Sequence, residues 1–312
     1  MMKTSPGVRE TPVTTGLPYH VEFQDVTERY DFRFDCVPAT DGYPLYTYEF
    51  GKTSDDGFVL VGAVGTSSLL MMKLASQLAT SRYSLCYEHR GSPYLKDSQP
   101  DREITVPEYA SDLGQILSAR EVKNLHLVGH CSSANIISWA VSRDAITPSS
   151  VTLIAPAGIG SSSEKLYAQE VFFPMLQNVT KQTDPEARKT VATVQNLAGL
   201  GHKSRVRDSD VQRITLINIR DFRSARRYAH LLSGAELSLK ESALLFDDMC
   251  AKVPVLVLHA LDDQVISHTS SVNALGRNSQ RNVRLVLYPS GTHFLPYTRA
   301  ADIASEMTVF QS

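Results

Sequence analysis

The sequence predicts an α/β fold: a mostly parallel central sheet flanked by helices on both faces, with an inserted helical cap. Short apolar runs recur along the chain, and amphipathic stretches of helical period separate them. A segment of about 90 residues in the second half lacks such runs and is amphipathic throughout. Strands buried on both faces are apolar throughout, and parallel strands need a long crossover, usually a helix.

The folded part is predicted to begin near Tyr30 with a hairpin at one edge of the sheet. Two runs rich in aromatic and β-branched residues, Tyr30–Val37 and Leu45–Phe50, flank a turn at Thr40-Asp41-Gly42. Residues 1–28 hold turn-forming residues with little periodicity, so we expect an N-terminal arm without chemistry.

The remaining strands and helices alternate. Strands are expected at Phe58–Val64, Tyr83–Tyr87, Leu125–Val128, Val151–Ile154, Val255–Leu258 and Val283–Leu287. Helices are expected at Leu69–Leu78, Val106–Ala119, Ala134–Val141 and Ser270–Leu275. Right-handed crossovers of this kind build a doubly covered sheet. Residues 29–157 and 251–312 are therefore predicted to form the core, and residues 158–250 the helical cap.

Composition narrows the class of protein. The chain has 312 residues, with 31 Lys and Arg against 33 Asp and Glu and no block of one sign, which favours neither nucleic acid nor an anionic membrane as partner. The chain start lacks the apolar core of a secretory signal, and no run reaches the roughly 20 apolar residues of a membrane span. We expect a cytoplasmic protein.

The four cysteines are predicted to be reduced thiols. Cys36, Cys86, Cys131 and Cys250 lie far apart, without a Cys-x-x-Cys pair or the paired Cys and His spacing of a zinc site. No metal or other cofactor is expected.

The strongest functional motif is Gly129-His130-Cys131-Ser132-Ser133, where an apolar strand enters an apolar helix through small residues. A nucleophile at such an elbow needs small neighbours two positions away, and the helix that follows supplies N–H groups and positive potential. A thiol there becomes reactive when an imidazole serves it. Two alternatives remain: Ser132 is a rival hydroxyl, and Cys131 could be a small buried apolar residue.

These motifs resemble the α/β-hydrolase superfamily, and the resemblance extends from about Tyr30 to the end of the chain. Cys131 stands where most members carry serine, which is similar to polyhydroxyalkanoate synthases, dienelactone hydrolases and some biosynthetic thioesterases. Ser133 replaces the second glycine of the elbow. The resemblance implies an α/β-hydrolase fold with a cysteine nucleophile.

The resemblance also implies an acid, a base and an oxyanion hole. The family usually carries its acid three residues after a glycine, and Ala260 stands at the position of that glycine. Asp263, three residues beyond Ala260, therefore has the better spacing, and Asp262 is its rival. Whichever carboxylate is not catalytic would cap the following turn. His293 lies in Gly291-Thr292-His293-Phe294, which resembles the Gly-x-His-Phe ending of the family.

For the oxyanion hole, the resemblance implies the Ser132 N–H and a second donor from the loop after the third strand. That loop reads Gly62-Ala63-Val64-Gly65, so the second donor is either Val64 or Ala63.

The expected function is acyl transfer through a covalent thioester on Cys131. A thioester remains activated toward amines, thiols and stabilised carbon nucleophiles, which favours a thioesterase-like acyltransferase or cyclase of biosynthesis. Its substrate would be an acyl thioester of a carrier protein or coenzyme A. Four cap residues are candidates to bind such an acidic partner, or else belong to a solvated helical face: Arg220, Arg223, Arg226 and Arg227. The alternatives are a small ester or lactone hydrolase, similar to dienelactone hydrolases, and a non-catalytic ligand-binding protein on the same fold.

Overall fold

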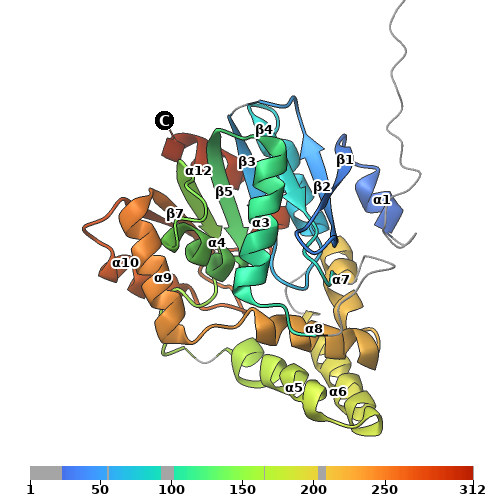
Figure 1. Cartoon of the computed structure of the whole chain (residues 1–312). Helices are drawn as coiled ribbons and strands as arrows, with labels where there is room; N and C mark the ends of the chain where they lie inside the picture. Colours follow the sequence, from blue (N-terminus) through green and yellow to red (C-terminus); the bar gives the residue numbers. More distant parts are fainter. Residues whose placement is uncertain (1–22, 55, 93–101, 165, 203–208, 312) are drawn as a thin grey trace, which may run out of the picture.

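A computed structural model describes residues 23–54, 56–92, 102–164, 166–202 and 209–311 of the chain. Its centre is an eight-stranded sheet in the order β1-β2-β4-β3-β5-β6-β7-β8 (Figure 1). The strands are β1 Arg33–Pro38, β2 Pro44–Phe50, β3 Asp56–Val61, β4 Tyr83–Tyr87, β5 Asn124–His130, β6 Ser150–Ile154, β7 Val255–Ala260 and β8 Val283–Tyr288. Strand β2 runs antiparallel to β1 and β4, and all other neighbours run parallel, which confirms the predicted α/β sheet with its edge hairpin.

Burial along the strands explains why their sequences differ. Every residue of β4, β6 and β7 is buried, since helices cover both faces of the inner strands. The edge strand β1 is mostly exposed. Strand β3 ends at Val61 rather than at Val64 as expected, because the chain turns there: Thr66 N–H donates to the Ala63 carbonyl at 3.0 Å.

Two layers of helices cover the sheet. They are α1 Gln24–Thr27, α2 Leu69–Leu78, α3 Val106–Arg120, α4 Ser133–Ser142, α9 Leu239–Lys252, α10 His268–Arg277, α11 Leu295–Thr298 and α12 Ala300–Gln311. Helices α3, α4 and α9 contribute to one apolar cluster on one face, and α2, α11 and α12 to a second cluster on the other. The bounds of α2 coincide with those expected from the sequence.

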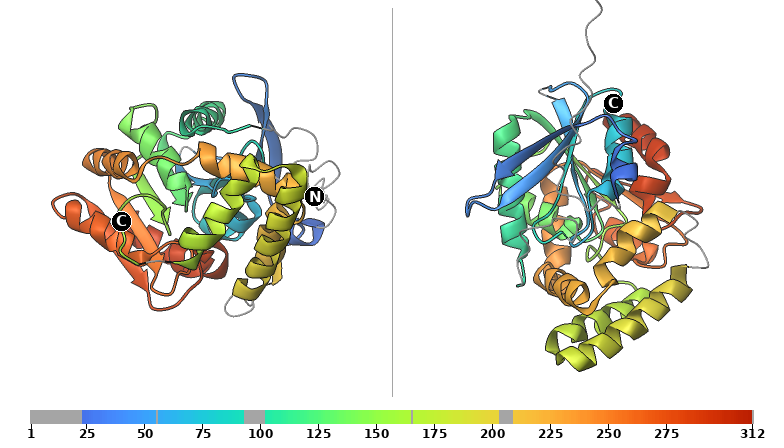
Figure 2. Two further views of the ribbon diagram at one scale, coloured as in Figure 1. Left: turned by 90° about the horizontal axis from the view of Figure 1, so that it is seen from below. Right: turned by 90° about the vertical axis from the view of Figure 1, so that its right-hand side faces the viewer.

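A set of helices between β6 and β7 has a small apolar core of its own. They are η2 Ala168–Phe172, α5 Phe173–Asn178, η3 Val179–Lys181, α6 Asp184–His202, α7 Ser209–Leu216, η4 Ile217–Ile219 and α8 Phe222–Gly234. Residues of α5, α6 and α8, including Leu176, Val191 and Ala225, pack together away from the sheet (Figure 2). Helix α9, although inside the range predicted for the cap, packs instead on α4 of the flanking layer, where the Ser142 hydroxyl donates to the Leu245 carbonyl.

Helix α8 joins these helices to the sheet (Figure 1). It rests on Gly65 and Gly91, which lie beyond the carboxyl ends of β3 and β4. A Cβ on Gly65 would lie 2.5 Å from the Tyr228 ring, and one on Gly91 would lie 2.7 Å from Leu231. Both glycines have positive φ, 72° and 79°, so their conformation and the close approach both require glycine.

Most of the predicted N-terminal arm, residues 1–22, lies outside the described residues. The described end forms the short helix α1, where Phe23 and Val26 are buried against the sheet core. Asp25 of this helix accepts a hydrogen bond from Arg213 of α7 at 2.9 Å. Residues 23–28 are therefore part of the folded body.

Candidate active site

The candidate site lies at the carboxyl ends of the parallel strands, where loops from separate strands meet. Cys131 follows β5, Asp263 follows β7 and His293 follows β8. In open parallel sheets this edge is where ligands bind, because crossovers leave crevices between the loops. Among the four cysteines, Cys131 is partly exposed, whereas Cys86 and Cys250 are buried in the core.

Cys131 occupies a strained turn between β5 and α4. Its φ is 54°, in the left-handed region that non-glycine residues rarely adopt outside special sites. Its N–H donates to the Ile154 carbonyl at 3.0 Å, and its carbonyl accepts from the Ala157 N–H at 3.1 Å. These bonds to the β6 loop hold the turn and leave the thiol at the start of helix α4.

The residues around Cys131 are small because larger side chains would collide with their neighbours in the turn. A Cβ on Gly129 would lie 2.7 Å from Ile137 and 2.9 Å from the Ser133 hydroxyl. Ser133 fits where a second glycine is usual because its hydroxyl donates to the His130 carbonyl at 2.8 Å. The residues predicted as a nucleophile elbow therefore form a tight strand-to-helix turn.

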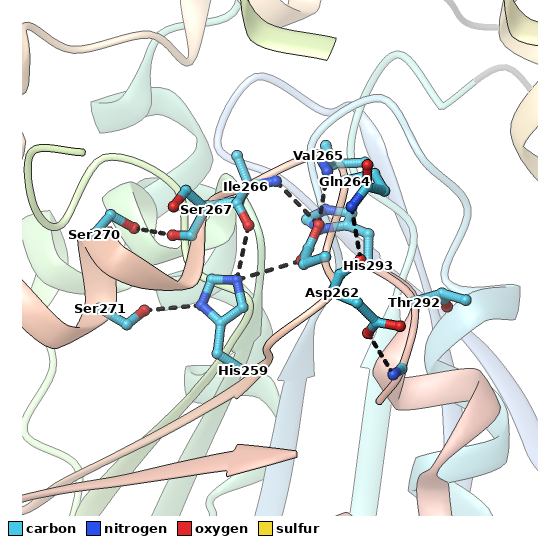
Figure 3. Close-up of polar contacts among 12 residues, drawn as sticks. His259, Asp262, Gln264, Val265, Ile266, Ser267, Ser270, Ser271, Thr292 and His293 are labelled. Carbon is cyan, nitrogen blue, oxygen red and sulfur yellow. Dashed lines mark hydrogen bonds and ion pairs between the residues drawn. The ribbon is translucent and has the colours of Figure 1, made fainter. Parts of the chain in front are cut away.

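Asp263 and His293 are in direct contact. The His293 Nδ1–H donates to Asp263 Oδ2 at 2.9 Å, while Oδ1 accepts the N–H groups of Val265 and Ile266 at 2.7 and 3.0 Å (Figure 3). Burial alone would raise the pKa of Asp263, but the imidazoles of His293 and His259 hold it well below its usual range. Asp263 is thus a buried, ionised carboxylate with both oxygens occupied.

Asp262 has a different partner. Its Oδ1 accepts the Gly291 N–H at 2.7 Å and ties the β7 loop to the β8 loop (Figure 3). Of the two adjacent carboxylates, only Asp263 contacts the His293 ring among the contacts of the described residues.

His293 links Asp263 to Cys131. Burial alone would lower the pKa of His293, but the Asp263 carboxylate and Cys131 outweigh it and raise the pKa to about 10. Because Nδ1 faces Asp263, Nε2 is the ring nitrogen that remains to serve Cys131. The raised pKa favours the imidazolium form of His293.

His130 packs against His293 and fixes its backbone. The two ring centroids are 4.9 Å apart, and His130 Nε2–H donates to the His293 carbonyl at 2.9 Å. Burial, aided by the charge of His293, lowers the pKa of His130 to about 3, so it stays neutral and serves packing.

The loop after β3 presents one of its two candidate donors to the elbow. Val64 N–H donates to the Ser132 hydroxyl at 2.9 Å, across 68 residues of sequence. The loop is held by Thr66, whose hydroxyl donates to the Ala63 carbonyl at 2.7 Å, and by buried His89, whose ring lies 2.8 Å from the Gly62 carbonyl. The Val64 N–H therefore faces Ser132, and the structure gives Ala63 no such contact with the elbow in the described residues.

Sequence reasoning missed two residues near the site, Tyr228 and His259. Tyr228 of α8 packs its ring on Gly65, and burial, with a smaller contribution from nearby Cys131, raises its pKa. His259 lies four residues before Asp263; its Nε2 is 3.3 Å from Asp263 Oδ2 and its Nδ1 is 2.9 Å from the Ser271 hydroxyl (Figure 3). Its spacing from Asp263 was the one available clue.

The four arginines predicted to bind an acidic partner lie on or just before α8, and their partners include residues of the cap. Arg226 pairs with Asp184 at 2.9 Å, Arg220 lies 3.5 Å from Asp221, and Arg223 lies over the Phe222 ring. Arg220 and Arg223 are exposed, whereas Arg226 and Arg227 are half-buried. The structure does not bring them into a hydrogen bond with Cys131, His293 or Asp263 among the described residues.

Two features are absent from the described residues. They contain no group of three or more His, Cys, Asp or Glu side chains arranged to hold a metal ion. Among the same residues, no helix combines the length and apolarity needed to cross a bilayer.

Solved structures share the fold at low sequence identity. An aryl esterase from Burkholderia cenocepacia, described as putative, matches with a TM-score of 0.66 and 17% identity over 89% of this chain and 99% of that one. A thioesterase domain from the curacin biosynthetic pathway matches with a TM-score of 0.65 and 12% identity over 90% and 100%. An enol-lactonase from Burkholderia xenovorans matches with a TM-score of 0.63 and 16% identity over 89% and 99%.

Sequence comparison gives the family. No curated protein matches the chain. The family model described as alpha/beta hydrolase fold matches residues 58–300, which include most of β3, all of β4 to β8 and every residue of the candidate site. The chain therefore belongs to the alpha/beta hydrolase fold family.

Proposed function

We propose that the protein transfers acyl groups through a covalent thioester on Cys131. Membership of the family supports a hydrolase-type enzyme. The observation that carries the finer proposal is the contact of Cys131 with His293, which is itself bonded to the buried Asp263 carboxylate. A thiol, an imidazole and a carboxylate in this order form the arrangement needed for nucleophilic catalysis.

In the first half-reaction, the Cys131 thiolate attacks the carbonyl carbon of an acyl thioester. The carbonyl π electrons move to oxygen, and the resulting oxyanion lies near the N–H groups at the start of α4. When the intermediate collapses, the bond to the leaving sulfur breaks. The His293 imidazolium then gives its Nε2 proton to the departing thiolate, and the acyl group remains on Cys131.

In the second half-reaction, neutral His293 takes a proton from the acceptor as the acceptor attacks the acyl-enzyme. An amine, a thiol or a stabilised carbon nucleophile gives transfer or cyclisation, and water gives hydrolysis. Asp263 remains ionised and stabilises the imidazolium, since its pKa lies well below the usual range. Acyl thioesters of coenzyme A or of a carrier protein are the proposed donors, and the exposed Arg220 and Arg223 would attract their negative charges.

The test is intact mass spectrometry after incubation with acyl-coenzyme A and with acyl-pantetheine. The wild-type protein should gain one acyl mass, which peptide mapping assigns to Cys131. Cys131→Ala should gain none and lose at least about 10⁴-fold in turnover. Cys36→Ala is the matched control, because it removes an exposed thiol at the β1 edge and should leave adduct and turnover unchanged.

Other outcomes would replace the proposal. An adduct on Ser132, or full turnover by Cys131→Ala, would refute the cysteine intermediate. Turnover of esters or lactones with no reaction on thioesters would support the small hydrolase instead. Ligand binding without turnover of any acyl compound would support a non-catalytic protein.

A further inference from the structure

The Ser132 hydroxyl is diverted from the role that a serine usually has at the start of a helix. Ser132 is the N-cap residue of α4, yet its side chain makes no capping hydrogen bond. By contrast, Ser238 and Ser267, at the N-caps of α9 and α10, each accept a backbone N–H of their own helix. The Ser132 hydroxyl instead accepts the Val64 N–H of the loop after β3 at 2.9 Å.

This contact occupies the Val64 amide, which faces the residue next to Cys131. A substrate oxygen beside Cys131 would need donors from Ser132 and from the loop after β3. An N–H group makes one good hydrogen bond, so the Ser132 oxygen and a substrate oxygen cannot both accept fully from Val64. Either the hydroxyl leaves when substrate binds, or it takes part in binding the oxygen.

The loop around Val64 is held in place, which favours the second possibility. The Ala63 carbonyl accepts a hydrogen bond from the Thr66 hydroxyl, and the Gly62 carbonyl accepts one from the His89 ring. Gly65 is covered by the ring of Tyr228, to which a Cβ at that position would approach within 2.5 Å. Val64 therefore has little freedom to move toward a substrate, and its N–H remains directed at Ser132.

A hydroxyl that accepts a hydrogen bond keeps its own proton to donate. The Val64 amide draws electron density from the Ser132 oxygen, which makes the O–H a stronger donor through cooperativity. The hydroxyl belongs to the residue next to Cys131, so it is close to the carbonyl that the sulfur attacks.

We propose that the Ser132 hydroxyl is a catalytic donor that binds the oxyanion, with the Val64 amide behind it. The Ser132 N–H and O–H would both donate to the oxygen of the tetrahedral intermediate. Ser132 keeps its proton and forms no covalent bond; the oxygen gains charge as the sulfur–carbon bond forms and loses it as the leaving group departs. This inference rests on the proposed function, because it needs acylation of Cys131.

Two reactions of Cys131 separate this role from a general effect on the thiol. Acylation by acyl-coenzyme A forms an oxyanion, whereas alkylation by iodoacetamide displaces iodide and forms none. Ser132→Ala should slow acylation by about 10²-fold, the effect of losing one oxyanion donor, and leave the alkylation rate unchanged. Ser132→Thr, which keeps a hydroxyl, should recover most of the acylation rate. Because Ser132→Ala also leaves the buried Val64 N–H without its acceptor, its melting temperature should fall somewhat, and both rates are compared at a temperature at which wild type and variant are fully folded.

Three outcomes would refute the proposed role of the Ser132 hydroxyl. If Ser132→Ala is acylated as fast as wild type or faster, the hydroxyl only blocks the Val64 amide and the proposal is wrong. Equal losses in acylation and alkylation would mean that Ser132 acts on the sulfur, which also refutes it. A wild-type protein that is alkylated but never acylated would instead refute the proposed function, and this role with it.

Discussion

The charged groups of the sheet edge and those of the cap illustrate two different electrostatic regimes. Asp263 and His293 are 4% and 6% exposed, so water screens their interaction poorly. Arg220 and Asp221 are nearly half exposed, and their charges lie 3.5 Å apart in high dielectric. An ion pair should therefore control the chemistry at the sheet edge, whereas an ion pair of the cap should contribute little to activity or stability.

The largest effect expected from this contrast is on the two adjacent carboxylates. Asp263→Asn removes the charge that stabilises the His293 imidazolium and should lower kcat by about 10²- to 10⁴-fold. Asp262→Asn is its matched control, since an amide oxygen still accepts the Gly291 N–H, and kcat should stay within about threefold. Steady-state kinetics on one acyl thioester measures both; a larger loss from Asp262→Asn would reverse the assignment.

The second prediction concerns protonation of His293. Its ring should titrate with a midpoint about 10 in wild type, and lower in both Asp263→Asn and Cys131→Ala, because each partner favours the cation. Histidine NMR across pH 5 to 11 measures the midpoint. A midpoint near 6.5 in wild type would contradict the ion pair.

The same raised pKa has a consequence for stability. A histidine whose pKa is higher in the folded than in the unfolded state stabilises the fold fully below pH 6.5, and this contribution disappears as the pH rises to about 10. The difference in denaturant midpoint between wild type and His293→Ala should therefore shrink from pH 6 to pH 10. A difference that grows with pH would give the opposite sign.

A smaller effect is expected at His259, which among the described residues contacts Asp263 rather than Cys131 or His293. Its Nε2 faces two acceptors, the Ile266 carbonyl and Asp263 Oδ2, so that nitrogen carries the proton and helps to position the carboxylate. His259→Asn, which cannot reach as far, should lower kcat by about tenfold with KM little changed. His259→Gln, whose amide nitrogen reaches near the Nε2 position, should restore most of it. Equal activity in both variants and wild type would remove His259 from this role.

The smallest effect is expected on the cap. Reversing the exposed charges with Arg220→Glu and Arg223→Glu should raise KM for acyl-coenzyme A by several-fold at low salt. The effect should fade as added salt shortens the Debye length to about 8 Å and below. Arg143→Glu, at the C-cap of α4, is the charge-matched control for each single reversal, and a small neutral thioester is the substrate control. Unchanged KM values for all substrates would leave Arg220 and Arg223 as solvated surface.

The sequence predicted the sheet well because burial on both faces leaves a direct trace in composition. Strands such as β4 are buried at every residue, and the small residues around Cys131 follow from space at a single local turn. Periodicity likewise gave the bounds of α2, whose apolar residues face the sheet.

Contacts between distant loops could not be predicted in this way. Asp262 and Asp263 are neighbours with equal chemistry, and their different partners depend on how the β7 and β8 loops meet. The packing of Tyr228 on Gly65 joins residues far apart in the chain, which no local pattern records. The position of α9 is a similar case, because its apolar face fits either a cap or a flanking layer.

The seating of α8 on Gly65 and Gly91 restricts how the helical segment could be exchanged in protein engineering. A graft that brings a foreign helix to these loops must carry side chains shaped to two positions without Cβ atoms, where Tyr228 and Leu231 now lie. Gly65 directly follows Val64, so a poor fit would displace the amide that contacts Ser132. Recombination of this core with other caps should therefore succeed when the junction falls before α8 begins, so that α8 is inherited with the core, and fail when the junction divides α8.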